Sequence, residues 1–213
     1  RPARGIPTSS VYCIHSYFNE LFWRLHQSQP RQERVKDMSY VLEVTDLSIT
    51  FDTPRGNLRA VNDATITLEK GESIGVVGES GSGKTVLSRA IMGLLPGTAT
   101  RTGSIKYMGQ EISELPEKEL RNLWGTGMAM IFQDPMTALN PVRRIGAQLT
   151  ESLTVRLGMD KKAAKQKAIE LLIRVRIPDP ESMLRKFPYQ LSGGMRQRIM
   201  IAIAVSCEPE LLF

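Results

Sequence analysis

The sequence predicts an α/β fold built around a phosphate-binding loop. Three observations point to it: a glycine-rich string at residues 78–85 between two apolar segments, alternating apolar and polar residues at 40–75, and helical spacing across 140–186. With 213 residues and 41% hydrophobic content, the chain is long enough for one globular unit with an additional lobe.

The stretch before the glycine-rich string reads as antiparallel strands. Turn signals at 54–56 and 70–72 interrupt its alternating pattern, and the last strand of the stretch, at 73–77, is expected to be short and buried. Phe51 ends the alternating segment 44–51, where one interpretation makes it a core residue of the strand.

The glycine-rich string fits the pattern G-x-x-x-x-G-K-[ST] and consists of Gly78, Glu79, Ser80, Gly81, Ser82, Gly83, Lys84 and Thr85. Its glycines let the backbone approach phosphates closely, and N–H groups at the start of the helix expected at 86–92 favour anions. We expect Lys84 to bridge the β- and γ-phosphates of a nucleotide and the Thr85 hydroxyl to ligate Mg²⁺. The alternative, a glycine-rich turn without a ligand, fits the flanking strand and helix less well.

Further elements follow the loop. Residues 103–109 predict a short strand and a turn, and a helix starts at 115–120 with Pro116 in its first turn. Residues 161–176 have helical spacing, with lysines 161, 162 and 165 on the solvated face. The apolar positions of that helix are Ala164, Ala168, Leu171, Leu172 and Val175.

A second motif lies near the end of the chain and consists of Leu191, Ser192, Gly193, Gly194 and Met195. Ser192 is suited to cap the apolar helix expected at 195–205, whose free N–H groups would favour a phosphate. Taken alone, this string is better explained as an ordinary capped helix that follows a loop.

Together with the first string, residues 189–198 resemble the signature sequence of ABC-type ATPases. The resemblance implies a P-loop NTPase (RecA-like) core with an antiparallel β subdomain and an α-helical subdomain, and ATP and Mg²⁺ as cofactors. In that family, the residues matching Ser192, Gly193, Gly194 and Met195 close over the γ-phosphate held by a second ATPase subunit.

The same resemblance implies roles for two further residues, Gln133 and Phe51. Gln133 follows the apolar residues 128–132 and resembles the family's Q-loop, which implies contacts to Mg²⁺ and the attacking water beside the membrane partner. Lys84 and Gln133 are therefore the candidate catalytic residues. The alternative for Gln133 is a solvated side chain. Phe51 lies near the position where the family stacks an aromatic ring on adenine, so that both interpretations of Phe51 stay open.

Three segments resemble one branch of the family, the peptide importers, which take up dipeptides, oligopeptides, glutathione or nickel. These segments are residues 58–63, 130–141 and 190–204. This resemblance implies three kinds of partner: a second ATPase subunit, identical or different, transmembrane permease subunits, and indirectly a periplasmic or surface substrate-binding protein. The expected location is peripheral, on the cytoplasmic face of the inner membrane.

The domain organisation follows from where the resemblance begins. We expect an ABC-type domain at 38–213, with a helical subdomain at about 135–190, and an N-terminal extension at 1–37 that holds both histidines. The extension reads either as an amphipathic helix on a membrane surface or as sequence translated upstream of the natural start, which we favour.

The chain ends at Phe213, where the family's Walker B strand would continue to an aspartate and a glutamate. The C-terminal part of the core is therefore expected to be incomplete, without these carboxylates and without the switch histidine. We predict that these 213 residues alone do not hydrolyse ATP.

Composition excludes several other classes. Two cysteines form no disulfide framework, and no apolar run approaches the ~18 residues of a membrane span. Much of the net charge of +6 comes from residues 1–37, so we expect no nucleic-acid partner.

Two alternatives remain, a non-transport ABC ATPase acting on the ribosome or DNA and a nucleotide-binding fragment without activity. The segment 133–140 favours the importer.

Overall fold

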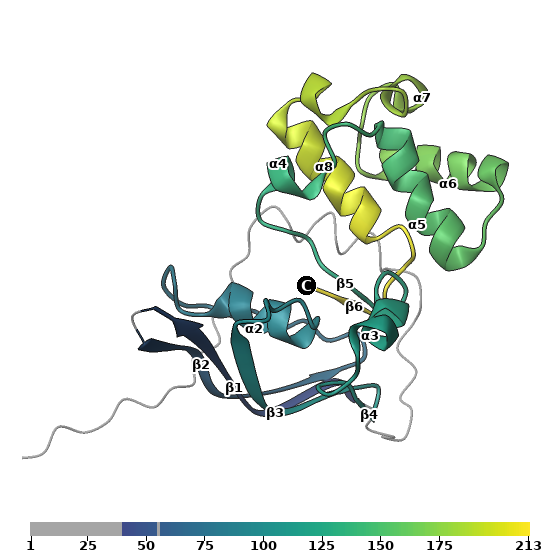
Figure 1. Ribbon diagram of the computed structural model, residues 1–213. Helices are drawn as coiled ribbons and strands as arrows, with labels where there is room; N and C mark the ends of the chain where they lie inside the picture. Colours follow the sequence, from purple (N-terminus) through teal and green to yellow (C-terminus); the bar gives the residue numbers. More distant parts are fainter. Residues whose placement is uncertain (1–39, 55) are drawn as a thin grey trace, which may run out of the picture. The chain divides into compact units, whose positions relative to one another are not determined.

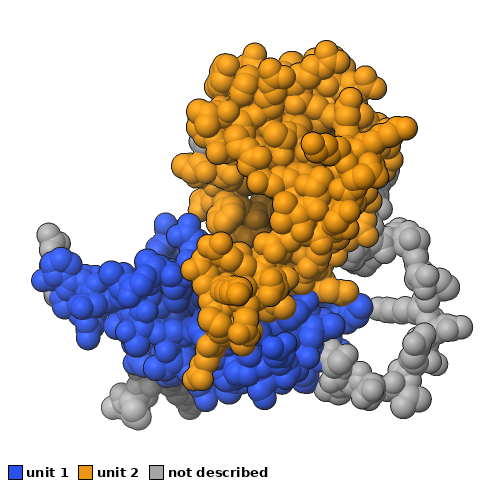
Figure 2. Space-filling view, turned by 45° about the vertical axis from the view of Figure 1, so that its right-hand side comes forward, with its two compact units in different colours: residues 1–113 blue, residues 114–213 orange. Residues whose placement is uncertain are grey.

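The computed structural model describes residues 40–54 and 56–213. The chain divides into two compact units, residues 1–113 and residues 114–213, which Figure 2 shows in different colours. The predictions made for residues 1–37 and for the start of the domain at residue 38 lie outside the described residues.

Unit 1 (residues 1–113) is an antiparallel sheet with one helix in its described part (Figure 1). The elements are β1 (Tyr40–Thr53), β2 (Gly56–Glu69), α2 (Lys84–Ile91), β3 (Ala99–Tyr107) and β4 (Gln110–Glu111). The sheet order is β2-β1-β3-β4. The prediction of antiparallel strands before the loop is therefore confirmed for β1 and β2, and the strand expected at 103–109 is part of the longer β3.

Strand β1 is central and pairs with β2 on one side and β3 on the other. The buried residues of β1 are Val41, Leu42, Val44 and residues 47–49. A bulge interrupts β1 at Asp46, which has a φ of 50°. The pairing register of β1 with β2 and with β3 changes at this bulge. The backbone N–H of Asp46 donates to Thr65 Oγ1 over 3.1 Å, which satisfies a group that the bulge takes out of the ladder.

Glu111 closes the hairpin of β3 and β4. Its carboxylate accepts hydrogen bonds from the backbone N–H groups of Ile105 (3.0 Å) and Ser113 (3.1 Å) and from the hydroxyls of Ser104 and Ser113. Partial burial raises the pKa of Glu111, but these hydrogen bonds outweigh burial and lower the pKa from 4.5 to about 2.

The strand expected at 73–77 was predicted wrongly. Residues 72–79 have no regular secondary structure, and Ile74 and Val77 are 43% and 69% exposed. A strand needs a hydrogen-bonded neighbour, and within residues 40–54 and 56–213 no strand pairs with this segment. Its apolar side chains therefore have no sheet to join.

Unit 2 (residues 114–213) is mainly helical. Its elements are α3 (Glu117–Leu123), β5 (Met128–Ala129), α4 (Pro135–Ala138), α5 (Ile145–Leu157), α6 (Lys161–Arg174), α7 (Pro180–Met183), the 3-10 turn η1 (Pro188–Gln190), α8 (Gly193–Ala204) and β6 (Leu211–Leu212). Strands β5 and β6 pair in parallel. Pro116, expected in the first turn of a helix, is instead the N-cap of α3, with an extended ψ of 151°.

The core of unit 2 lies among α5, α6 and α8 (Figure 1). The five positions predicted to be apolar and buried in the helix at 161–176 are all buried, and lysines 161, 162 and 165 are exposed as expected. Helix α6 starts at an effective cap, because Asp160 Oδ1 accepts from the N–H groups of Lys162 (2.8 Å) and Ala163 (3.0 Å). It follows a left-handed glycine, Gly158, which ends α5.

No helix in the described ranges is both long and apolar enough to cross a membrane.

Substitutions at two neighbouring residues of α6 measure how much the helical core stabilises unit 2. Leu172 is fully buried, whereas Ile173 beside it is 58% exposed. We expect Leu172→Ala to lower the free energy of unfolding by about 2–5 kcal/mol, because it leaves a cavity among α5, α6 and α8. Ile173→Ala is expected to cost less than about 1 kcal/mol. Denaturant unfolding monitored by circular dichroism measures both, and equal losses would contradict the assigned core.

The carboxylate of Glu111 predicts a specific dependence of stability on pH. Because its folded-state pKa is depressed, its contribution is present above pH 4.5 and is lost as the pH falls toward about 2. Glu111→Gln should therefore be less stable than the parent at pH 6, and the difference should vanish near pH 2. Asp52→Asn, an exposed acid at the end of β1, is the control. A difference between Glu111→Gln and the parent that does not change with pH would exclude this role.

Candidate functional site

The glycine-rich loop of unit 1 forms a compact turn between the irregular segment 72–79 and helix α2. The N–H of Ser82 donates to the carbonyl of Glu79 over 3.2 Å, and Gly81 and Gly83 take φ values of 84° and 89°. Helix α2 begins at Lys84, two residues before the predicted start, and its first hydrogen bond runs from the N–H of Leu87 to the carbonyl of Gly83 (2.8 Å). The loop therefore leads directly into a helix N-terminus, where anions are stabilised.

Close backbone contact fixes this loop on strand β2. A Cβ built on Gly83 would lie 2.2 Å from the carbonyl oxygen of Ala60, a contact that no side chain tolerates. A Cβ on Gly78 would lie 2.6 Å from Ser82 Oγ. The glycine at 83 is thus required by its left-handed backbone and by its contact with β2.

The side chain of Lys84 curls back into the loop. Its ammonium donates to the carbonyl oxygens of Gly78 (2.7 Å) and Glu79 (2.6 Å) and to Ser82 Oγ (3.1 Å). Thr85, in the first turn of α2, is exposed. An ammonium, a helix start and a hydroxyl are thus gathered on a few consecutive residues. This donor set suits phosphate oxygens, with the hydroxyl available to a hard cation.

Phe51 lies near the end of β1, opposite Leu58 of β2 and Ala99 of β3. Phe51 is half-buried, so that it is partly open to solvent.

Gln133 belongs to unit 2 and lies in a bend between β5 and α4, with its side chain exposed. The chain before it extends β5, because the N–H of Ile131 donates to the carbonyl of Phe213 over 2.8 Å. Helix α4, which begins two residues after Gln133, packs against α8 (Figure 1).

The second motif starts helix α8 as the sequence predicted. Ser192 is the N-cap, and its hydroxyl oxygen accepts from the N–H of Met195 at 3.4 Å. Ser192, Gly193 and Gly194 are exposed, whereas Met195 packs partly against the helical core. The start of α8 is therefore open to solvent while the rest of the helix is anchored.

Sequence reasoning missed the contacts that hold the segment before Ser192. Gln190 Oε1 accepts from the N–H of Phe187 (2.8 Å), and Arg196 Nε donates to the carbonyl of Pro188 (2.8 Å). The Arg144 guanidinium lies over the Phe187 ring at 5.6 Å, and the Tyr189 ring stacks on it, also at 5.6 Å. Gln190 and Arg196 belong to the motif at residues 189–198, which does not predict these contacts, and nothing in the local sequence pairs Arg144 with Phe187.

The structure brings Lys84 together with Gly78, Glu79 and Ser82 in unit 1. Gln133 and Ser192 belong to two segments of unit 2 that are joined by the packing of α4 against α8. The described residues hold no group of three or more His, Cys, Asp or Glu that could bind a metal ion.

A family model described as ABC transporter matches residues 61–213. The chain belongs to the ABC transporter family. The oligopeptide transport ATP-binding protein OppD of Salmonella typhimurium is 45% identical over 185 residues, which are 87% of this chain and 55% of that protein. The dipeptide transport ATP-binding protein DppD of Escherichia coli is 48% identical over 174 residues, 81% of this chain and 53% of that protein. The chain thus spans about half the length of the curated relatives it matches.

Solved ABC transporter cassettes share the fold. The dimeric structure of the bacterial ABC transporter cassette MJ0796 aligns with a TM-score of 0.72 at 22% identity, over 80% of this chain and 72% of that one. CbiO1 of Clostridium perfringens aligns with a TM-score of 0.62 at 23% identity, over 82% of this chain and 64% of that one. These similarities confirm the predicted fold class, an α/β P-loop NTPase core with an antiparallel β part and a helical part.

Proposed function

We propose that this chain is the nucleotide-binding part of an ATP-hydrolysing subunit that energises an ABC importer of peptides or related small solutes. One observation carries the proposal: the loop at residues 78–85 combines a helix start, two left-handed glycines and an inward-turned lysine ammonium. Two of its relatives, an oligopeptide and a dipeptide transport ATP-binding protein, support the peptide branch.

In this proposal, the loop binds the phosphates of ATP. Backbone N–H groups at the start of α2 donate to phosphate oxygens, and the ammonium of Lys84 exchanges the carbonyls of Gly78 and Glu79 for the β- and γ-phosphates. The Thr85 hydroxyl and the Gln133 amide would hold Mg²⁺, which neutralises charge that develops on the transferred phosphoryl group. Gln133 also orients the attacking water. Phe51, which is partly open to solvent, is available to stack on adenine.

The second motif acts on a neighbouring subunit. Ser192 caps α8 at an exposed N-terminus, so the residues Ser192 to Met195 can face the γ-phosphate that a second ATPase subunit, identical or different, holds. A solved cassette with the same fold is described as a dimer bound to ADP and phosphate, which supports this arrangement. ATP then acts as a bridge between subunits, and its hydrolysis separates them.

The remaining partners follow from the importer branch. We propose that the domain spans residues 38–213, with a helical subdomain at about 135–190 near which Gln133 meets a permease subunit. A periplasmic or surface substrate-binding protein would act indirectly, through the permease. The protein would lie on the cytoplasmic face of the inner membrane, bound through the permease. No nucleic acid is involved.

Replacing the loop lysine tests the nucleotide site. We expect Lys84→Ala to weaken binding of a fluorescent ATP analogue about tenfold to hundredfold, because charge-assisted hydrogen bonds to phosphate are lost. Lys165→Ala, which removes an exposed lysine from α6, is the matched control and should bind as the parent does. The measurement is fluorescence titration of the full-length protein. Unchanged affinity in Lys84→Ala would refute the phosphate-binding assignment.

Two substitutions of Ser192 test its action across subunits. Aspartate is as good an N-cap as serine, so Ser192→Asp should keep α8 folded while its charge repels a γ-phosphate. We expect Ser192→Asp to abolish ATP-dependent dimerisation with nucleotide affinity of the monomer unchanged, and Ser192→Thr to dimerise normally. Light scattering with a non-hydrolysable ATP analogue measures the association. Normal dimerisation of Ser192→Asp would show that this serine does not face a partner's nucleotide.

A further inference from the structure

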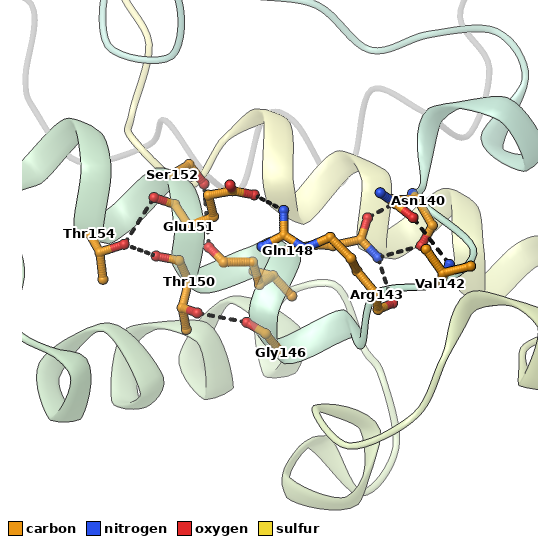
Figure 3. A network of polar contacts seen from close by, with 10 residues as sticks. Asn140, Val142, Arg143, Gly146, Gln148, Thr150, Glu151, Ser152 and Thr154 are labelled. Atoms are coloured by element: carbon orange, nitrogen blue, oxygen red, sulfur yellow. Dashed lines mark hydrogen bonds and ion pairs between the residues drawn. The ribbon is translucent and has the colours of Figure 1, made fainter.

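A single amide side chain holds the turn that follows α4 (Figure 3). Gln148, in the second turn of α5, accepts through Oε1 from the N–H of Asn140 at 2.9 Å. Through Nε2 it donates to the carbonyl oxygens of Asn140 (3.0 Å) and Arg143 (2.9 Å). Gln148 thus uses both of its amide donors and one acceptor on the backbone of residues 140–143.

Other attachments of this turn are weaker. The Asn140 side chain accepts from the N–H of Val142 (3.1 Å), a contact within the turn, and Val142 itself is 80% exposed. The ion pair of Arg143 with Glu151 joins exposed side chains, and pairs of this kind contribute ~1 kcal/mol or less. The three backbone hydrogen bonds of Gln148 are therefore the main polar attachment of the turn to α5.

The turn joins the two segments of unit 2 that carry the proposed function. Asn140 follows α4 by two residues, and α4 connects Gln133 to the signature helix α8 by packing against it.

On its other side, the turn leads into the start of α5, which is bonded to the chain before the signature. The N–H of Ile145 donates to the carbonyl of Lys186 and that of Gly146 to the carbonyl of Leu184, both at 2.9 Å. The approach is close, because a Cβ on Gly146 would lie 2.7 Å from the Leu184 oxygen. A displacement at either end is therefore transmitted to a backbone that leads to Ser192.

We propose that Gln148 is a positioning residue that keeps the Gln133 segment in register with the signature segment. It holds the turn at 140–143 against α5, so that the Gln133 amide and the start of α8 keep one arrangement. This inference rests on the proposed function, because it assigns a consequence to the roles of Gln133 and Ser192. Gln148 touches no nucleotide in this account, so its effect is on turnover and not on nucleotide affinity.

Two substitutions of similar size separate this role from simple packing. Gln148→Glu keeps the acceptor for Asn140 but places a carboxylate oxygen against two carbonyl oxygens. Gln148→Met removes all three hydrogen bonds without adding charge. Gln166, which is exposed on α6, supplies the matched controls Gln166→Glu and Gln166→Met.

The experiment measures steady-state ATP hydrolysis by the full-length ATP-binding subunit, together with the affinity for a fluorescent ATP analogue and the melting temperature. We expect both Gln148 variants to lower kcat about tenfold or more, since small displacements of positioned groups have effects of that size. KM and analogue affinity should stay close to the parent values, whereas the melting temperature should fall by a few degrees because hydrogen bonds of the turn are lost. Hydrogen exchange should become faster at the amides of residues 140–143. Both Gln166 variants should match the parent throughout.

Three results would overturn the inference, and they are distinguishable. If the parent hydrolyses ATP and both Gln148 variants have its kcat, the inference fails and the proposed function stands. If kcat, affinity and melting temperature fall together in both variants, Gln148 is a structural residue only. If the parent neither binds nor hydrolyses ATP, the proposed function fails, and the role assigned to Gln148 fails with it.

Discussion

The contact between Gly83 and the Ala60 carbonyl determines where the loop at residues 78–85 lies in unit 1. No Cβ fits at this point, so the loop backbone rests directly on β2 and helix α2 starts one residue later. Because α2 starts there, Lys84 reaches back to the carbonyls of Gly78 and Glu79, and Thr85 stands in the first turn. Every group that the proposed function assigns to phosphate binding in unit 1 depends on this one close approach.

In unit 2, hydrogen bonds between side chains and backbone groups fix the segments next to the two candidate site residues. Arg196 and Gln190 fix the chain just before Ser192, and Gln148 fixes the turn after α4. Most of these contacts join a side chain to a backbone carbonyl or N–H that no regular element satisfies. The exposed starts of α8 and of the Gln133 segment are therefore held by polar contacts behind them, which leaves their outer faces available to ligands and partners.

Features encoded within a few residues could be predicted from the sequence. The loop motif, the Ser192 cap and the buried face of α6 depend on local spacing, and the structure has all three. The strand expected at 73–77 depends on a hydrogen-bonded neighbour, which an apolar run cannot supply by itself. The contacts of Gln148 depend on the shape of a turn eight residues earlier, and Arg144 meets Phe187 only because α5 packs beside that segment.

The central claim is that the loop at residues 78–85 binds the phosphates of a nucleotide. Backbone amide resonances of the full-length protein, followed by NMR during titration with MgADP, test it most directly. We expect the largest shifts at the amides of Gly81, Gly83, Lys84 and Thr85, with saturation at one equivalent. Saturable binding that leaves these four amides unshifted would contradict it.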